Sequence, residues 1–89
     1  MTKQILCFGD SNTWGYNAKD GSRYSQDIRW TGRLAKLLPH STIIEEGLNG
    51  RTTQTDYKDR KGKHGMNYLY PCLDSHSPVD LVTLCLGAN

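Results

Sequence analysis

The sequence has no long hydrophobic run. Among its 89 residues, the longest apolar stretches are Ile5–Phe8 and Leu81–Leu86, and Thr83 interrupts the second. A helix that crosses a bilayer needs about 20 consecutive apolar residues, and a secretory signal needs a longer apolar segment than the one near the amino terminus. The sequence therefore predicts neither a membrane span nor a secretory signal.

Paired cysteines and an excess of one charge are also missing. The three cysteines (Cys7, Cys72 and Cys85) form no C-x-x-C motif and stand in apolar segments. This favours buried free thiols in a reducing, cytoplasmic compartment over disulfides or a zinc site. The net charge is +2, and the stretch Lys58–Lys63 alone contributes +3. Because nucleic-acid binding needs an extended basic surface, we expect no nucleic-acid partner and interpret this stretch as a solvated loop.

What the sequence does contain is a regular alternation of strand and helix patterns. Apolar or β-branched runs predict strands over 4–8, 42–46 and 81–86. The order β-α-β-α-β predicts an α/β fold with a parallel sheet and right-handed crossovers. The third strand looks suited to pairing on both edges, yet the sequence stops three residues beyond it. We therefore expect residues 1–89 to be the first half of a single domain.

Two helices are expected between these strands. The first would be capped by Asp27 and run to Leu38, and the second would begin near Asn67, which would put Pro71 in its first turn. Their predicted buried stripes are Trp30, Leu34, Leu37 and Leu38 in the first helix, and Leu69, Cys72, Leu73 and His76 in the second.

Three short segments should leave the same edge of this sheet, which is where open parallel sheets bind ligands. Ser11, Gly50 and Asn89 follow the three strands at similar distances along the chain. Alone, each has a simpler interpretation: a helix cap, a turn glycine and a turn or terminal residue. Together, a hydroxyl, a backbone N–H and a carboxamide are the parts of a nucleophile with an oxyanion hole.

These segments resemble the sequence blocks of the SGNH (GDSL) hydrolases. Gly9–Gly15 resembles the first block, Gly50 the glycine of the second, and Gly87–Asn89 the third, which stops before its aspartate. Further similarity to the arylesterase-like, acyltransferase-capable branch lies in 27–32, 44–48 and 68–73. The resemblance covers essentially the whole chain but only the amino-terminal part of the family's domain.

The resemblance implies a flavodoxin-like α/β/α sandwich that hydrolyses or transfers acyl esters. Ser11 would be the nucleophile, and the N–H groups of Ser11 and Gly50 with the Asn89 amide would hold the oxyanion. Asp10 would order the turn through backbone hydrogen bonds rather than move protons. The remaining motif residues, which would shape the turns, are Gly9, Asn12 and Gly87.

The family's base, a histidine in an Asp-x-x-His segment near the carboxyl terminus, has no match here. His40, His64 and His76 lie in a turn, in the basic loop and on a helix stripe. Losing a triad base costs about 10⁴–10⁶ in turnover. A terminal carboxylate at Asn89 would also oppose a developing oxyanion. We therefore expect the 89-residue chain alone to be nearly inactive.

The expected substrate is a small acyl or aryl ester, with a pocket that could draw on Trp14, Tyr16, Tyr24 and Tyr57, although each alone more simply covers the edge of the core. No metal is expected, because the histidines and carboxylates show no ligand spacing. No cofactor and no membrane partner are expected either, and a homo-oligomer is compatible with the sequence. Two alternatives stay open: a phosphate- or nucleotide-binding flavodoxin-like module, and a non-catalytic fragment that acts through its open strand edge.

Overall fold

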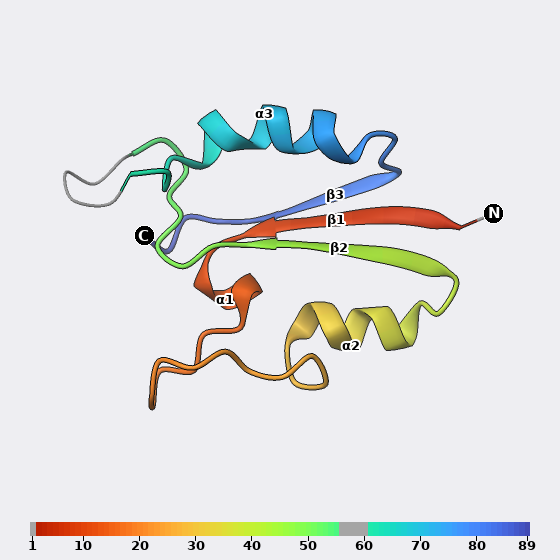
Figure 1. The fold of residues 1–89 in the computed structure, drawn as a ribbon, viewed down its shortest axis with the longest axis horizontal. Coiled ribbons are helices and arrows are strands. Elements are labelled where there is room, and N and C mark those ends of the chain that lie inside the picture. Colours follow the sequence, from red (N-terminus) through yellow and green to blue (C-terminus); the bar gives the residue numbers. More distant parts are fainter. Residues whose placement is uncertain (1, 56–60) are drawn as a thin grey trace.

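Three parallel strands run side by side through the centre of the molecule (Figure 1). A computed structural model describes residues 2–55 and 61–89 of the chain. The strands are β1 (Lys3–Gly9), β2 (Ser41–Gly47) and β3 (Leu81–Cys85), in the order β2-β1-β3. Both neighbours pair with β1 in parallel, as the β-α-β-α-β pattern predicts.

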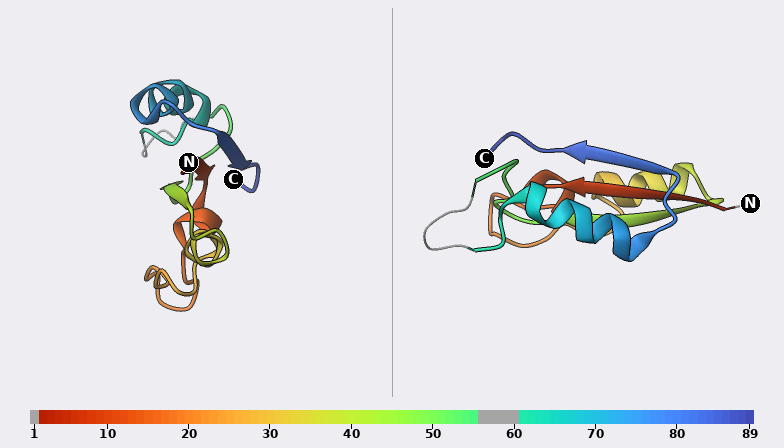
Figure 2. Two further views of the ribbon diagram at one scale, coloured as in Figure 1. Left: turned by 90° about the vertical axis from the view of Figure 1, so that its right-hand side faces the viewer. Right: turned by 90° about the horizontal axis from the view of Figure 1, so that it is seen from above.

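The helices cover both faces of this sheet. α1 (Ser11–Trp14) and α2 (Trp30–Leu37) lie on one face, and α3 (Gly65–His76) lies on the other. The view along the strands in Figure 2 shows α2 and α3 on opposite sides of the sheet. The three-layer α/β/α arrangement is confirmed, and α1 is a short helix that the sequence pattern did not predict.

The core is centred on β1, which has a strand on each edge and helices over both faces. Its side chains from Ile5 to Phe8 are all buried, which explains why this strand is continuously apolar instead of alternating. Leu6 and Phe8 pack with Cys72 of α3. The partly buried side chains around them are Ile44, Leu69, Leu73, Val79, Val82 and Leu86.

The predicted start of the first helix is wrong. α2 begins at Trp30, and the preceding residue Arg29 has an extended ψ of 140° and no capping side chain. Asp27 instead forms an exposed ion pair with Lys36, with 2.8 Å between carboxylate and ammonium. The predicted stripe also fails at Leu37 and Leu38, which are 77% and 39% exposed. Asp27 does not cap the helix, because the Arg29 side chain is held by Glu45 on β2 and fixes where α2 begins.

The predicted start of the second helix is wrong as well. α3 begins at Gly65, two residues before Asn67, so Pro71 is its seventh residue and not part of the first turn. His64 caps the helix by accepting a hydrogen bond from the Asn67 N–H, which explains the earlier start. The predicted stripe of α3 does face the core, because Cys72 is buried and its other members are partly buried.

The three cysteines are free, as expected, but only two of them are buried. Cys7 and Cys72 are enclosed, and burial raises the pKa of both thiols. Cys85, at the end of β3, is exposed, so the prediction of three buried thiols is wrong there. Within residues 2–55 and 61–89, no helix has the length and apolar character needed to cross a membrane.

Candidate active site at the carboxyl edge of the sheet

The turn after β1 makes Ser11 the first residue of α1. Asp10 is 1% exposed, and its carboxylate caps the helix by accepting a hydrogen bond from the Asn12 N–H at 3.0 Å. At Gly9, a Cβ atom would overlap the Thr13 side chain, so glycine is needed for α1 to sit this close to the strand. The prediction that Asp10 orders this turn is confirmed.

The loop after β2 folds back over the end of β1. The Leu48 N–H donates to the Gly9 carbonyl at 3.2 Å, and the Arg51 N–H donates to the Leu48 carbonyl at 3.1 Å. This turn places Gly50 at a φ of 77°, where other residues are strained. A Cβ atom at Gly47 would overlap the backbone of α1. Gly9 at the end of β1 and Gly47 at the end of β2 thus allow α1 to pack closely on the sheet.

The segment after β3 reaches the same loop. Gly87 turns the chain with a φ of 111°, and the Asn89 side-chain amide donates to the Arg51 carbonyl at 3.0 Å. Arg51 directly follows Gly50, so the Asn89 side chain lies beside the Gly50 turn. In Figure 1 the carboxyl end of the chain lies next to the loop that follows β2.

The three strands end at the same level. Gly9 is paired with Gly47 in β2 and with Cys85 in β3. The segments that carry Ser11, Gly50 and Asn89 therefore emerge from one edge of the sheet, as the strand order requires. Hydrogen bonds join the Gly50 turn to the end of β1 and to Asn89 after β3. The roles of Ser11 as nucleophile and of Ser11, Gly50 and Asn89 as the oxyanion hole stay predictions.

The histidines are engaged elsewhere. His76 Nε2 lies 2.9 Å from Glu46 Oε1, and His64 caps α3. His40 lies in the turn between α2 and β2, at the opposite edge of the sheet. Asp80 is also at that edge, where its carboxylate accepts a hydrogen bond from the Gln4 N–H at 2.7 Å. These contacts of His64, His76 and Asp80 are with Asn67, Glu46 and Gln4.

A cluster of Glu46, Cys72 and His76 corrects the expectation that the chain contains no set of metal-ligand type. Their possible ligand atoms all lie within 4.8 Å of one another. The Tyr68 hydroxyl donates to Glu46 Oε2 at 3.3 Å, and His76 contacts Oε1, so both carboxylate oxygens are occupied. We interpret the cluster as the polar contact between β2 and α3. Glu46 thus takes its side-chain partners from this helix. The four-residue spacing of Cys72 and His76, which puts both on one helix face, was the sequence signal for the cluster.

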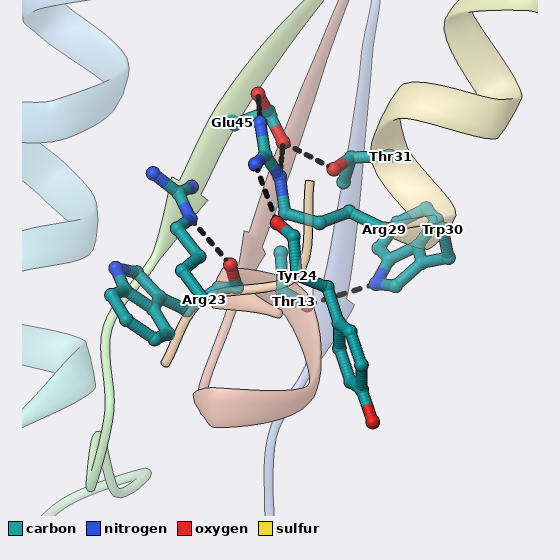
Figure 3. A network of polar contacts seen from close by, with 8 residues as sticks. Thr13, Arg23, Tyr24, Arg29, Trp30, Thr31 and Glu45 are labelled. Atoms are coloured by element: carbon teal, nitrogen blue, oxygen red, sulfur yellow. Dashed lines mark hydrogen bonds and ion pairs between the residues drawn. The ribbon is translucent and has the colours of Figure 1, made fainter. Parts of the chain in front are cut away.

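A second polar network fastens the opposite face of the sheet (Figure 3). Arg29 donates to both oxygens of Glu45, at 2.9 and 3.0 Å, and to the Tyr24 carbonyl at 2.9 Å. The Thr31 hydroxyl also donates to Glu45. The Arg29 hydrogen bond is the main reason that the pKa of Glu45 is lowered, with burial opposing it. This network ties the long loop after α1 to β2.

A hollow of about 500 Å³ lies beside the Gly50 turn. The residues that line it are Leu48, Arg51, Gly62, His64, Asn67 and Tyr68. Of the aromatic residues considered for an acyl pocket, Trp14 stacks under the Arg23 guanidinium at 5.1 Å, and Tyr16 and Tyr24 are exposed on the surface. Tyr57 lies outside the described residues. Tyr68, which is not one of these four residues, is the aromatic side chain that lines this hollow.

Comparison with known proteins gives consistent matches. The sequence profile of the GDSL-like lipase/acylhydrolase family matches residues 7–89. A carbohydrate acetylesterase family member from Sinorhizobium meliloti is 41% identical, with a TM-score of 0.93 over 99% of this chain and 42% of that one. The native aryl esterase of M. smegmatis is 47% identical, with a TM-score of 0.89 over 97% of this chain and 42% of that one. No match was found among curated protein sequences.

A more distant solved structure is AlinE4, an SGNH-hydrolase family esterase, at 26% identity, with a TM-score of 0.72 over 100% of this chain and 42% of that one. The chain thus spans 42% of the length of each of these three structures. Identity is higher to the aryl esterase and the acetylesterase than to AlinE4, in agreement with the branch that the sequence resembles. The profile match over all but the first six residues, together with these folds, shows that the chain belongs to the GDSL-like lipase/acylhydrolase family, the SGNH hydrolases.

Proposed function

We propose that this chain carries the nucleophile and the oxyanion hole of a serine ester hydrolase that acts on short acyl esters. The observation that supports this most is the meeting of three segments at one sheet edge, with the Asn89 amide bound to the carbonyl that follows Gly50. The name of one similar structure, a carbohydrate acetylesterase, points to a small acyl group, and that of another, an aryl esterase, points to aryl esters. Acyl transfer to an alcohol is a second outcome of the same chemistry.

In the proposed reaction, the Ser11 Oγ attacks the ester carbonyl and forms a tetrahedral intermediate. Its oxyanion is held by the N–H groups of Ser11 and Gly50 and by the Asn89 side-chain amide. Collapse expels the alcohol and leaves an acyl group on Ser11, which water then removes. Asp10 keeps the turn in place, because its carboxylate is already bound to the Asn12 N–H.

The proton of Ser11 must pass to a general base, and we assign that base to a histidine outside residues 1–89. The three histidines described above are held by other contacts or lie at the far edge of the sheet. A polypeptide with these 89 residues alone would then be nearly inert toward esters. We also propose a cytoplasmic location, on the ground that the three cysteines are free.

The alternative of a phosphate site after β1 is less well supported. The Asp10 carboxylate occupies the start of α1, where a bound phosphate would need free N–H groups and would meet a like charge. The ester hydrolase proposal accounts for the three converging segments, whereas a phosphate site would use only one of them.

A chromogenic assay with p-nitrophenyl acetate on the protein in its natural full length tests the proposal. Ser11→Ala is expected to lower kcat by at least ~10³-fold, because the nucleophile is lost. Asn89→Ala is expected to lower it ~10²–10³-fold, as for other oxyanion-hole donors. Ser22→Ala, an exposed serine that contacts Asp20, serves as the matched control and should leave kcat unchanged. Hydrolysis that survives Ser11→Ala would contradict the proposal.

A further inference from the structure

Arg51 is a buried arginine at the centre of the converging segments. It is 3% exposed, and its guanidinium lies 4.1 Å from the centre of the Phe8 ring and 5.2 Å from that of Tyr68. One terminal nitrogen, Nη1, donates to the carbonyls of Gly9 at 3.1 Å and Glu46 at 2.6 Å. These carbonyls belong to the carboxyl ends of β1 and β2. The side chain therefore bridges two strands where they enter the candidate site.

The backbone of Arg51 extends the same bridge. Its N–H closes the turn around Gly50 by donating to the Leu48 carbonyl, and its carbonyl accepts the Asn89 side-chain amide. One residue thus contacts the strand that leads to Ser11, the Gly50 turn and the segment after β3.

We propose that Arg51 is a positioning residue that sets the relative placement of Ser11, Gly50 and Asn89. This inference rests on the proposed function and adds to it the side chain that holds the oxyanion-hole donors in register. Arg51 touches no reacting atom in this role. It acts through the Gly9 carbonyl on the nucleophile turn, and through its own backbone on the other two donors.

The burial of a cation here is difficult to explain by stability alone. Burial lowers the pKa of Arg51, and the charge of Glu46 only partly opposes this. Replacing buried charges with well-packed apolar groups is often neutral or stabilising. An apolar side chain packed against Phe8 and Tyr68 would fill the same space, but it could not hold two carbonyl oxygens. Lysine could not do both either, because it lacks the planar group that stacks on aromatic rings while donating.

The experiment compares Arg51→Met and Arg51→Lys with Arg29→Met in the natural full-length protein. Arg29 is the matched control, because it is a largely buried arginine on the other face of the sheet with three side-chain hydrogen bonds of its own. The rate of p-nitrophenyl acetate hydrolysis is normalised to the folded fraction measured in denaturant. The inhibition constant of phenylboronic acid, which forms a tetrahedral adduct with a reactive serine, is measured in parallel.

Arg51→Met is expected to lower kcat about 100-fold with little change in KM, and Arg51→Lys about tenfold, because misplaced oxyanion donors weaken the transition state and not substrate binding. The inhibition constant of phenylboronic acid should rise by a similar factor. Arg29→Met should lower stability while kcat per folded molecule stays within about twofold. With Asn89→Ala as background, Arg51→Met should cost less than in the wild type, since one of the three donors it places is gone.

Several results would overturn the inference. One is a folded Arg51→Met protein with kcat close to wild type, and another is an equal loss of kcat in Arg29→Met. If Arg51→Met does not fold, Arg51→Lys decides, and wild-type boronate inhibition in that variant would reject the role. Absence of hydrolysis in the wild type, or indifference to Ser11→Ala, would instead reject the proposed function itself and the inference with it.

Discussion

The Glu45–Arg29 pair provides a quantitative test of how the loop after α1 is held to the sheet. Two hydrogen bonds of 2.9 and 3.0 Å join the guanidinium to the carboxylate, and the side chains of Arg29 and Glu45 are 12% and 23% exposed. Glu45→Gln keeps the size of the side chain and removes its charge. Arg29 is then left largely buried with a neutral partner.

The exposure of the pair decides the expected magnitude. Fully exposed ion pairs contribute about 0–1 kcal/mol, whereas removing one partner of a buried pair costs about 3–5 kcal/mol. For a pair between these limits, we expect Glu45→Gln to lower the free energy of unfolding by about 2 kcal/mol near pH 7.

The loss of stability in Glu45→Gln should depend on pH. The hydrogen bond from Arg29 lowers the pKa of Glu45 below its ordinary value of 4.5, so the folded protein binds this proton more weakly than the unfolded chain does. The stabilisation is therefore complete above that value and disappears as the pH falls through the lowered pKa. The difference between wild type and Glu45→Gln should shrink in the same acidic range.

Urea unfolding curves at several pH values measure this difference. Asp27→Asn is the control, because it makes the same chemical change in the exposed pair with Lys36, and should leave the unfolding midpoint unchanged. If Glu45→Gln costs no more than Asp27→Asn, or if its effect does not diminish in acid, the assigned role of the pair is refuted.

Two further changes test the packing of the site and the core. Gly47→Ala should lower the free energy of unfolding by about 1–3 kcal/mol and slow ester hydrolysis, because the new Cβ overlaps the backbone of α1. Urea unfolding and the p-nitrophenyl acetate assay measure the two effects. Wild-type stability and wild-type activity in this variant would show that α1 does not pack tightly on β2. Cys7 and Cys72 should resist iodoacetamide at about pH 8 until denaturant is added, since burial shields them and raises the pKa of both thiols. Mass spectrometry of the native protein would contradict this if either thiol were modified as fast as in the unfolded chain.

Much of the fold follows from local sequence features. The strands lie within one residue of the predicted ranges at either end, because apolar runs that stop at Gly9 and Gly47 leave little choice of conformation. Strand alternation likewise puts Glu45 and Glu46 on opposite faces of the sheet. Their partners agree with this, because Arg29 binds Glu45 on the face covered by α2 and His76 of α3 contacts Glu46 on the other face. The turn at Asp10 could also be predicted, because an aspartate before a helix binds an N–H two residues on.

The predictions failed where distant residues compete with a local signal. Asp27 has the chemistry of a helix cap, but the pairing of Arg29 with Glu45, 16 residues away, moves the start of α2. Leu37 belongs to an apolar stripe, yet it is exposed, since its position relative to the sheet is set by how α2 packs and not by its own sequence.

The sequence by itself therefore determined the order of the three strands and the two longer helices along the chain, the level at which the strands end and the edge from which Ser11, Gly50 and Asn89 emerge. Only the tertiary structure decided which polar groups meet there: Arg51 with the Gly9 and Glu46 carbonyls, Asn89 with Arg51, and Glu46 with His76. The reason is physical. Strand and turn preferences act between near neighbours along the chain, whereas a hydrogen bond between residues 5 to 42 positions apart depends on where folding brings its two partners.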